Sequence, residues 1–224
     1  MLKDALSDTW KLFRLHYAAF VAIILPIVIP VTTMIVVYQP LLQNKEFGFA
    51  HLLPVMLNVA AEPLYAVGVI FYISSFIYKG EIIDAKRAWM LGVKYWSPYL
   101  ILNILMGFII GAGAVFLIIP GVIFMVRFSF AKFELLLKGC DPAEAMKNSW
   151  MLTRDYMIEL IGGFALLFVV LVVPYFILQS TFTGSGLLYQ LSDIILTLVY
   201  SVLQVLFTIF AFRIYDHANE KRIR

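Results

Sequence analysis

The sequence predicts an all-helical integral membrane protein with six transmembrane helices, and three observations support this fold class. First, 62% of the 224 residues are hydrophobic and 14% are charged, whereas soluble domains carry about a quarter charged residues. Second, apolar stretches of the ~20 residues that a helix needs to cross the hydrocarbon core recur along the chain. Third, runs such as Leu100–Leu105 and Phe164–Val173 do not alternate between apolar and polar residues, which argues against the strands of an outer-membrane barrel.

The predicted spans pair as three hairpins within a single integral membrane domain, residues 1–224. In chain order the spans are residues 17–38, 54–78, 98–119, 121–137, 157–179 and 191–212. The first apolar segment is expected to be retained, because it is too long for a signal-peptide core and no small-residue cleavage site follows it. Four prolines inside spans predict kinks; they are Pro26, Pro30, Pro63 and Pro174.

A weak repeat precedes each hairpin. Three times a tryptophan is followed by a leucine two residues later and by a basic residue four or five residues later. The copies are Trp10 with Arg14, Trp89 with Lys94, and Trp150 with Arg154. Tryptophan on one face of a helix and Lys or Arg on the other are typical of a helix at the headgroup boundary. The sequence therefore predicts three units, 1–78, 79–137 and 138–224, each an interfacial amphipathic helix followed by a hairpin. Ordinary aromatic-belt anchors would show the same pattern.

Positive charge lies almost entirely on one side of these spans. Of the seventeen Lys and Arg residues, fifteen lie on one side, Lys132 at a span end among them; Lys45 falls in an opposite loop and Arg127 lies deeper within a span. Because basic loops stay in the cytoplasm during insertion, we expect both termini to be cytoplasmic. The net charge of +3 then favours contact with anionic lipid headgroups, and no soluble basic surface is predicted for nucleic acid.

One ion pair is predicted inside the membrane. Glu62 lies about a third of the way into the second span and Arg127 about six residues into the fourth, so both are expected about 10 Å below the far surface. Because an ionisable group in hydrocarbon normally pairs or faces water, we expect a Glu62–Arg127 pair in the bundle interior. It would act as a structural clamp or as part of a transport or proton-relay pathway. Asn58 lies one turn before Glu62 on the same face.

Other polar and small residues are assigned to packing and to helix ends. Asn103 and Gln204 are expected to hydrogen-bond neighbouring helices. Gly107 and Gly111 form a small-residue stripe where another helix could approach. Further assignments concern helix ends and pairs: Asp141 as an N-cap before Pro142, Glu134 with Lys138 as a helix pair, and Lys132 with Glu134 as snorkelling residues at a span end.

The residue types that carry chemistry do not group together. His16, His51 and His217 are isolated, and the single Cys140 cannot form an internal disulfide and has no metal-ligand spacing around it. No nucleophile elbow or phosphate loop is present. We therefore expect a non-enzymatic protein with no metal, no cofactor and no catalytic residue.

The segments Leu117–Phe124, Ala145–Thr153 and Phe210–Tyr215 carry a resemblance to known proteins. They resemble the YciC-like family of largely uncharacterised bacterial inner-membrane proteins. More distantly, they resemble the membrane domain associated with glycerophosphodiester phosphodiesterases. The resemblance covers about residues 100–215. It implies a six-span inner-membrane protein linked to envelope upkeep, and it supplies no catalytic residues.

Two function classes stay open. In the first, the tryptophan-and-basic surfaces bind lipid headgroups, a membrane-protein partner or a second copy of the chain, and contribute to envelope or lipid homeostasis. In the second, the Glu62–Arg127 region and the kinked helices form a small-molecule or lipid transporter or a flippase-like conduit. A water-filled cavity that reaches Glu62 would favour the conduit, and a filled bundle would favour binding.

Overall fold

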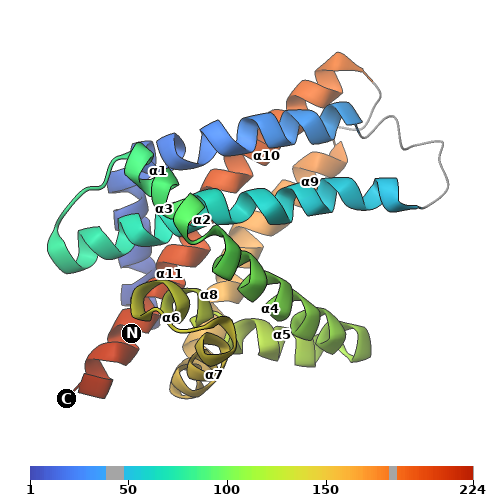
Figure 1. Ribbon diagram of the computed structural model, residues 1–224. Helices are drawn as coiled ribbons and strands as arrows, with labels where there is room; N and C mark the ends of the chain where they lie inside the picture. Colours follow the sequence, from blue (N-terminus) through green and yellow to red (C-terminus); the bar gives the residue numbers. More distant parts are fainter. Residues whose placement is uncertain (39–47, 182–185, 224) are drawn as a thin grey trace.

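The computed structural model describes residues 1–38, 48–181 and 186–223, and every regular element in these residues is a helix (Figure 1). The first half of the chain forms α1 Leu2–Tyr38, η2 Phe49–Leu52, α2 Leu53–Lys79, α3 Ala85–Lys94, α4 Trp96–Phe116 and α5 Ile118–Arg127. The second half forms α6 Ala131–Lys138, α7 Pro142–Leu152, η3 Thr153–Tyr156, α8 Met157–Leu167, the π-helix η4 Phe168–Val172, α9 Val173–Thr181, α10 Leu187–Leu203 and α11 Val205–Ile223.

Five helical stretches among the described residues are long and apolar enough to cross a membrane, as expected of a helical membrane protein. They are Leu2–Tyr38, Ala50–Lys79, Trp96–Val115, Pro142–Thr181 and Leu187–Lys221. The predicted fourth span, residues 121–137, is not among them. The chain there forms α5, a turn over residues 128–130 and α6. This segment contains three charged residues whose partners lie in different directions. A single straight helix could not bring all three side chains to their partners.

Helix α1 combines the first predicted interfacial segment and the first predicted span. Its backbone leaves helical geometry at His16 (φ −119°, ψ 16°), one residue before the predicted start of the span. The His16 Nδ1 atom hydrogen-bonds the Tyr72 hydroxyl of α2 at 2.8 Å. The bend therefore turns the amphipathic N-terminal half of α1 away from the apolar half, as Figure 1 shows.

Helix α3 folds back along the middle of α2. Gly80 ends α2 with a left-handed backbone (φ 67°), and the Asp84 side chain caps α3 by accepting a hydrogen bond from the Arg87 backbone N–H. The two helices touch backbone to backbone, because a Cβ on Gly92 would lie 2.1 Å from the Leu64 carbonyl oxygen. This close contact holds α3 against the bundle. The sequence predicts instead a helix that lies at the membrane surface.

The core is built around α6, at the end of the molecule where both termini lie (Figure 1). Five of its eight residues are buried, and Phe133 packs edge-on against Phe212 of α11. The close approach of Gly163 to Phe210 joins α8 to α11 in the same region. Neither α9 nor α10 contains a buried residue. Tight packing is therefore concentrated near the termini, and the far ends of the helices diverge (Figure 1).

Candidate functional site: polar clusters around α6

Glu62 forms an ion pair with Lys132, not with the predicted partner Arg127. The Lys132 Nζ atom donates to the Glu62 Oε1 atom at 2.9 Å, and each side chain is about one-third exposed. The turn at residues 128–130 explains the change of partner. It redirects the chain after Arg127, so Lys132 on α6 faces α2 and α4 whereas Arg127 faces α7.

Two polar side chains of α4 complete this cluster. The Tyr99 hydroxyl and the Asn103 amide lie beside the Glu62 carboxylate, and the Lys132 Nζ atom lies 5.3 Å from the Tyr99 ring centre. Neither the Tyr99 Oη atom nor the Asn103 Nδ2 atom reaches hydrogen-bond geometry, although both atoms are buried. Asn103 therefore belongs to a polar cluster rather than to general helix packing.

The other two predicted intramembrane polar residues lie outside the cluster. Asn58 is exposed, and its amide donates to the Pro54 carbonyl of its own helix at 3.0 Å. Gln204 is exposed and interrupts the helix between α10 and α11. Sequence spacing placed Asn58 on a helix correctly, but it did not show the break at Gln204 or the direction in which either side chain points.

Arg127 fastens the end of α5 to the end of α7. Its Nη1 atom donates to the Trp150 carbonyl at 3.0 Å, and its guanidinium carbon lies 4.9 Å from the centre of the Trp150 ring. In return, the Ser149 and Thr153 hydroxyls donate to the Arg127 carbonyl at 2.6 and 3.3 Å. The Arg127 Nε atom is buried and has no hydrogen-bond partner. The Nε–H group is therefore an unsatisfied donor enclosed by the protein.

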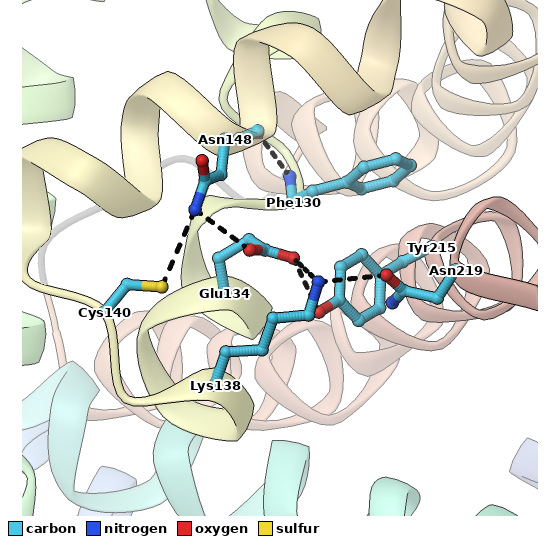
Figure 2. Close-up of polar contacts among 8 residues, drawn as sticks. Phe130, Glu134, Lys138, Cys140, Asn148, Tyr215 and Asn219 are labelled. Carbon is cyan, nitrogen blue, oxygen red and sulfur yellow. Dashed lines mark hydrogen bonds and ion pairs between the residues drawn. The ribbon is translucent and has the colours of Figure 1, made fainter. Parts of the chain in front are cut away.

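A second polar cluster surrounds Glu134, whose side chain is fully buried (Figure 2). Its Oε1 atom accepts from the Tyr215 hydroxyl at 2.8 Å and pairs with Lys138 Nζ at 2.6 Å. Its Oε2 atom accepts from the Asn148 amide at 3.3 Å, and Lys138 also donates to Asn219 at 3.0 Å. The predicted Glu134–Lys138 pair is confirmed. The prediction that Glu134 snorkels to an interface is wrong, because three partners satisfy the carboxylate inside the core.

A cavity of about 520 Å³ borders this cluster, and sequence reasoning did not find it. It lies between the end of α7, η3, the start of α8, α11 and the N-terminus, and Asn148 links it to Glu134. Its charged lining residues, Asp155, Glu159 and Lys221, come from three elements. No local spacing signals such a grouping. Within the described parts of the chain, no three His, Cys, Asp or Glu side chains gather as metal ligands.

The predicted interfacial residues divide into two groups. Trp10 and Trp150 are 51% and 38% exposed, and the side chains of Arg14, Lys94 and Arg154 are exposed as well. Trp89 instead turns into the fold, where its Nε1 atom donates to the Ile23 carbonyl of α1 at 2.9 Å. Its assignment as a headgroup contact is therefore wrong, because α3 is packed against the bundle through this tryptophan.

A family model matches residues 54–217, which extend from α2 into α11. The chain belongs to the family described as Domain of unknown function (DUF7847). The Glu62 cluster, the α4–α5 hairpin and all of the Glu134 cluster except Asn219 lie within the matched part of this DUF7847 protein, whereas α1 lies before it. No curated protein and no solved structure matches the chain. The resemblance to the YciC-like family stays a prediction.

Proposed function

We propose that this protein is a non-enzymatic protein of the bacterial inner membrane that binds anionic lipid headgroups in the cytoplasmic leaflet. Both termini lie in the cytoplasm in this proposal, and the protein contributes to envelope or lipid homeostasis. Lipid, a membrane-protein partner or a second copy of the chain would contact the same surface.

The observation that carries the proposal is the exposed rim of basic and tryptophan side chains at one end of the apolar helices. The segments that carry it are the N-terminal half of α1, α7 and η3, which gather near the two termini (Figure 1), whereas α3, with the exposed Lys94, lies along the middle of α2. Trp10 with Arg14, and Trp150 with Arg154, keep exposed side chains on this rim. Lys and Arg near an anionic surface each contribute about 1 kcal/mol of attraction, and tryptophan favours the headgroup level.

Arg127 adds a more specific headgroup contact to this rim. Its guanidinium lies over the Trp150 ring, and its Nη1 atom donates to the Trp150 carbonyl at an exposed position. Planar guanidinium groups bind phosphate oxygens through two parallel hydrogen bonds. A lipid phosphate at this position would bind the Nη groups of Arg127, because Nε is buried, while the neighbouring α4–α5 hairpin would contact the acyl chains.

The test compares lipid binding by the protein and by a charge-neutral triple variant, Arg14→Gln, Lys94→Gln and Arg154→Gln. Native mass spectrometry would count phosphatidylglycerol and phosphatidylcholine molecules of equal chain length bound to each protein. We expect phosphatidylglycerol to be preferred, and the triple variant to lose tenfold or more of that preference. The matched control keeps the charges: Arg14→Lys, Lys94→Arg and Arg154→Lys. Equal binding of the two lipids by the unaltered protein would contradict the proposal.

One observation favours a conduit as the second candidate function. The Tyr99 Oη and Asn103 Nδ2 atoms are buried without partners beside the Glu62–Lys132 pair, and buried polar atoms normally bind protein, water or a ligand. The conduit would then use Glu62 with Lys132 in place of Arg127. The 520 Å³ cavity, however, is lined by other residues.

Thiol labelling distinguishes the conduit from a filled bundle. In a Cys140→Ser background, Asn103→Cys would be exposed to a water-soluble maleimide in membrane vesicles of either orientation. Labelling from one side supports a water-filled path to the cluster. Protection equal to that of Leu102→Cys, a position that is fully buried, contradicts it.

A further inference from the structure

The second half of α4 and most of α5 form a hairpin that projects from the bundle, and only the last residues of α5, among them Phe124 and the fully buried Val126, pack against it. The residues of α4 that are buried against the core, Tyr99, Leu102 and Met106, all lie in its first half. Beyond Gly107, Phe108 is 77% exposed and Val115 is 86% exposed, whereas Ile110 still packs against the core. Figure 1 shows this hairpin projecting from the molecule, with its tip away from the far ends of the other helices.

The hairpin is apolar from its base to its tip and has no loop. No charged side chain occurs in residues 104–126, and the two helices are joined only by Leu117, which has an extended backbone. Gly113 and Gly121 let the helices touch, because a Cβ on Gly121 would lie 2.9 Å from the Ala114 Cβ atom. The two helices of the hairpin therefore pack against each other, and their outer apolar surface is not covered by the rest of the protein. That surface requires an apolar environment outside the protein.

The base of the hairpin is level with the beginning of a neighbouring long helix. The Arg127 carbonyl accepts hydrogen bonds from Ser149 and Thr153, and α8 begins four residues after Thr153, at Met157. From Met157 the helical chain continues through η4 and α9 to Thr181. At about 1.5 Å per residue, that chain is long enough to cross the ~30 Å hydrocarbon core.

The hairpin is long enough to reach only about half of the depth of the hydrocarbon core. Helix α5 has 10 residues, which corresponds to about 15 Å from its tip to Arg127. A tip that reached the far side would also place the exposed side chains of Leu117, Ile118 and Ile119 in water, where apolar surface is unfavourable. In the bilayer interior the same side chains are solvated by lipid.

We infer that residues 107–127 form a re-entrant hairpin that enters the bilayer from the side of Arg127 and ends near the bilayer midplane. The acyl chains of one leaflet cover the outer surface of the hairpin. Arg127 and Trp150 lie at the headgroup level of that leaflet. Four helices then cross the membrane, α1, α2, α8–α9 and α10–α11. Four crossings put both termini on one side, as six would, so the distribution of Lys and Arg agrees with either number.

Site-specific labelling tests the depth of the tip. In a Cys140→Ser background, Ile119→Cys would be treated with a membrane-impermeant maleimide in right-side-out and inverted vesicles. Gly48→Cys, in the connection that precedes α2, and Lys86→Cys, on α3, serve as controls for the two sides. We expect each control to react in one vesicle orientation, and Ile119→Cys to react in neither until detergent is added. Reaction of Ile119→Cys from the Gly48 side, or from the Lys86 side, would overturn the inference.

A depth measurement gives a second, independent result. A fluorophore on the Ile119→Cys protein in liposomes would be quenched by lipids that carry a nitroxide at different depths on the acyl chain. The inference requires the strongest quenching by the deepest nitroxide. Strongest quenching by a headgroup nitroxide would overturn it. Leu117→Cys provides the same measurement should the first variant express poorly. The result is independent of headgroup binding, because a re-entrant hairpin would keep its depth in a neutral bilayer.

Discussion

The indole Nε1 atom of Trp96 donates a 2.8 Å hydrogen bond to the carbonyl oxygen of Ala60, three residues before Pro63 in α2. Trp89 makes the same contact with Ile23, three residues before Pro26 in α1. Proline lacks an N–H and its ring crowds the preceding turn of the helix, so carbonyl groups of that turn are open to an outside donor. The two tryptophans thus attach the α3–α4 region to both helices of the first hairpin.

Replacement of Trp96 by phenylalanine should lower the free energy of unfolding by about 1 kcal/mol, because the ring stays while the Ala60 carbonyl loses its donor. The measurement is thermal or denaturant unfolding of the purified protein in detergent. Trp10→Phe is the matched control: Trp10 is half exposed, and its replacement should change stability by less than about 0.5 kcal/mol. Equal effects at the two positions would show that the hydrogen bond contributes nothing.

The Glu62–Lys132 pair predicts energetic coupling between these residues and none between Glu62 and Arg127. Unfolding of Glu62→Gln, Lys132→Met and the double variant should give an interaction energy of about 1–2 kcal/mol, as for contacting residues. The corresponding cycle with Arg127→Gln should be additive within about 0.5 kcal/mol. A larger coupling to Arg127 than to Lys132 would restore the pairing that the sequence suggests.

The contact between α3 and α2 predicts that Gly92→Ala is destabilising. The added Cβ would lie 2.1 Å from the Leu64 carbonyl oxygen, so the helices must separate, at a cost of about 1–3 kcal/mol. Gly111→Ala is the control, because nothing lies within 4 Å of a Cβ there and alanine favours helix by about 1 kcal/mol. Unfolding experiments on both variants should therefore give effects of opposite sign. A destabilised Gly111→Ala would indicate that a second copy packs on that face.

Cys140 should react slowly with alkylating reagents at neutral pH. Burial, followed by the nearby Glu144 and Glu134 carboxylates, raises the pKa of its thiol above the usual value. The thiolate is the reactive form, so the rate of alkylation should rise with pH and reach half its maximum above pH ~8.5. Glu144→Gln should shift that midpoint to lower pH. Glu159→Gln, which is not among the neighbours that raise this pKa, should leave it unchanged. A midpoint at or below pH ~8.5 in the unaltered protein would contradict the assignment.

Local sequence signals predicted helix class and several helix ends. The Asp141 N-cap is confirmed, since its carboxylate accepts from the Glu144 backbone N–H at 2.9 Å. The Glu134–Lys138 pair is also confirmed. A Cβ on Gly107 or Gly111 would meet nothing within 4 Å in this single chain, whereas Gly113 and Gly121 carry the close contact between α4 and α5. Spacing shows which residues share a face of a helix, but it contains no information about which helix covers that face.

The sequence by itself determined that this chain is helical, apolar and charged mainly on one side, because hydropathy, period and loop charge are local quantities. Only the tertiary structure decided that Lys132 pairs with Glu62, that Trp89 turns inward and that residues 121–137 are two helices. Trp89 turns inward because α3 packs against α1 and α2, and the other two outcomes follow from the turn at residues 128–130. The turn redirects the chain between Arg127 and Lys132, so the two side chains reach different partners. Neither composition nor periodicity records the direction of a side chain after a turn.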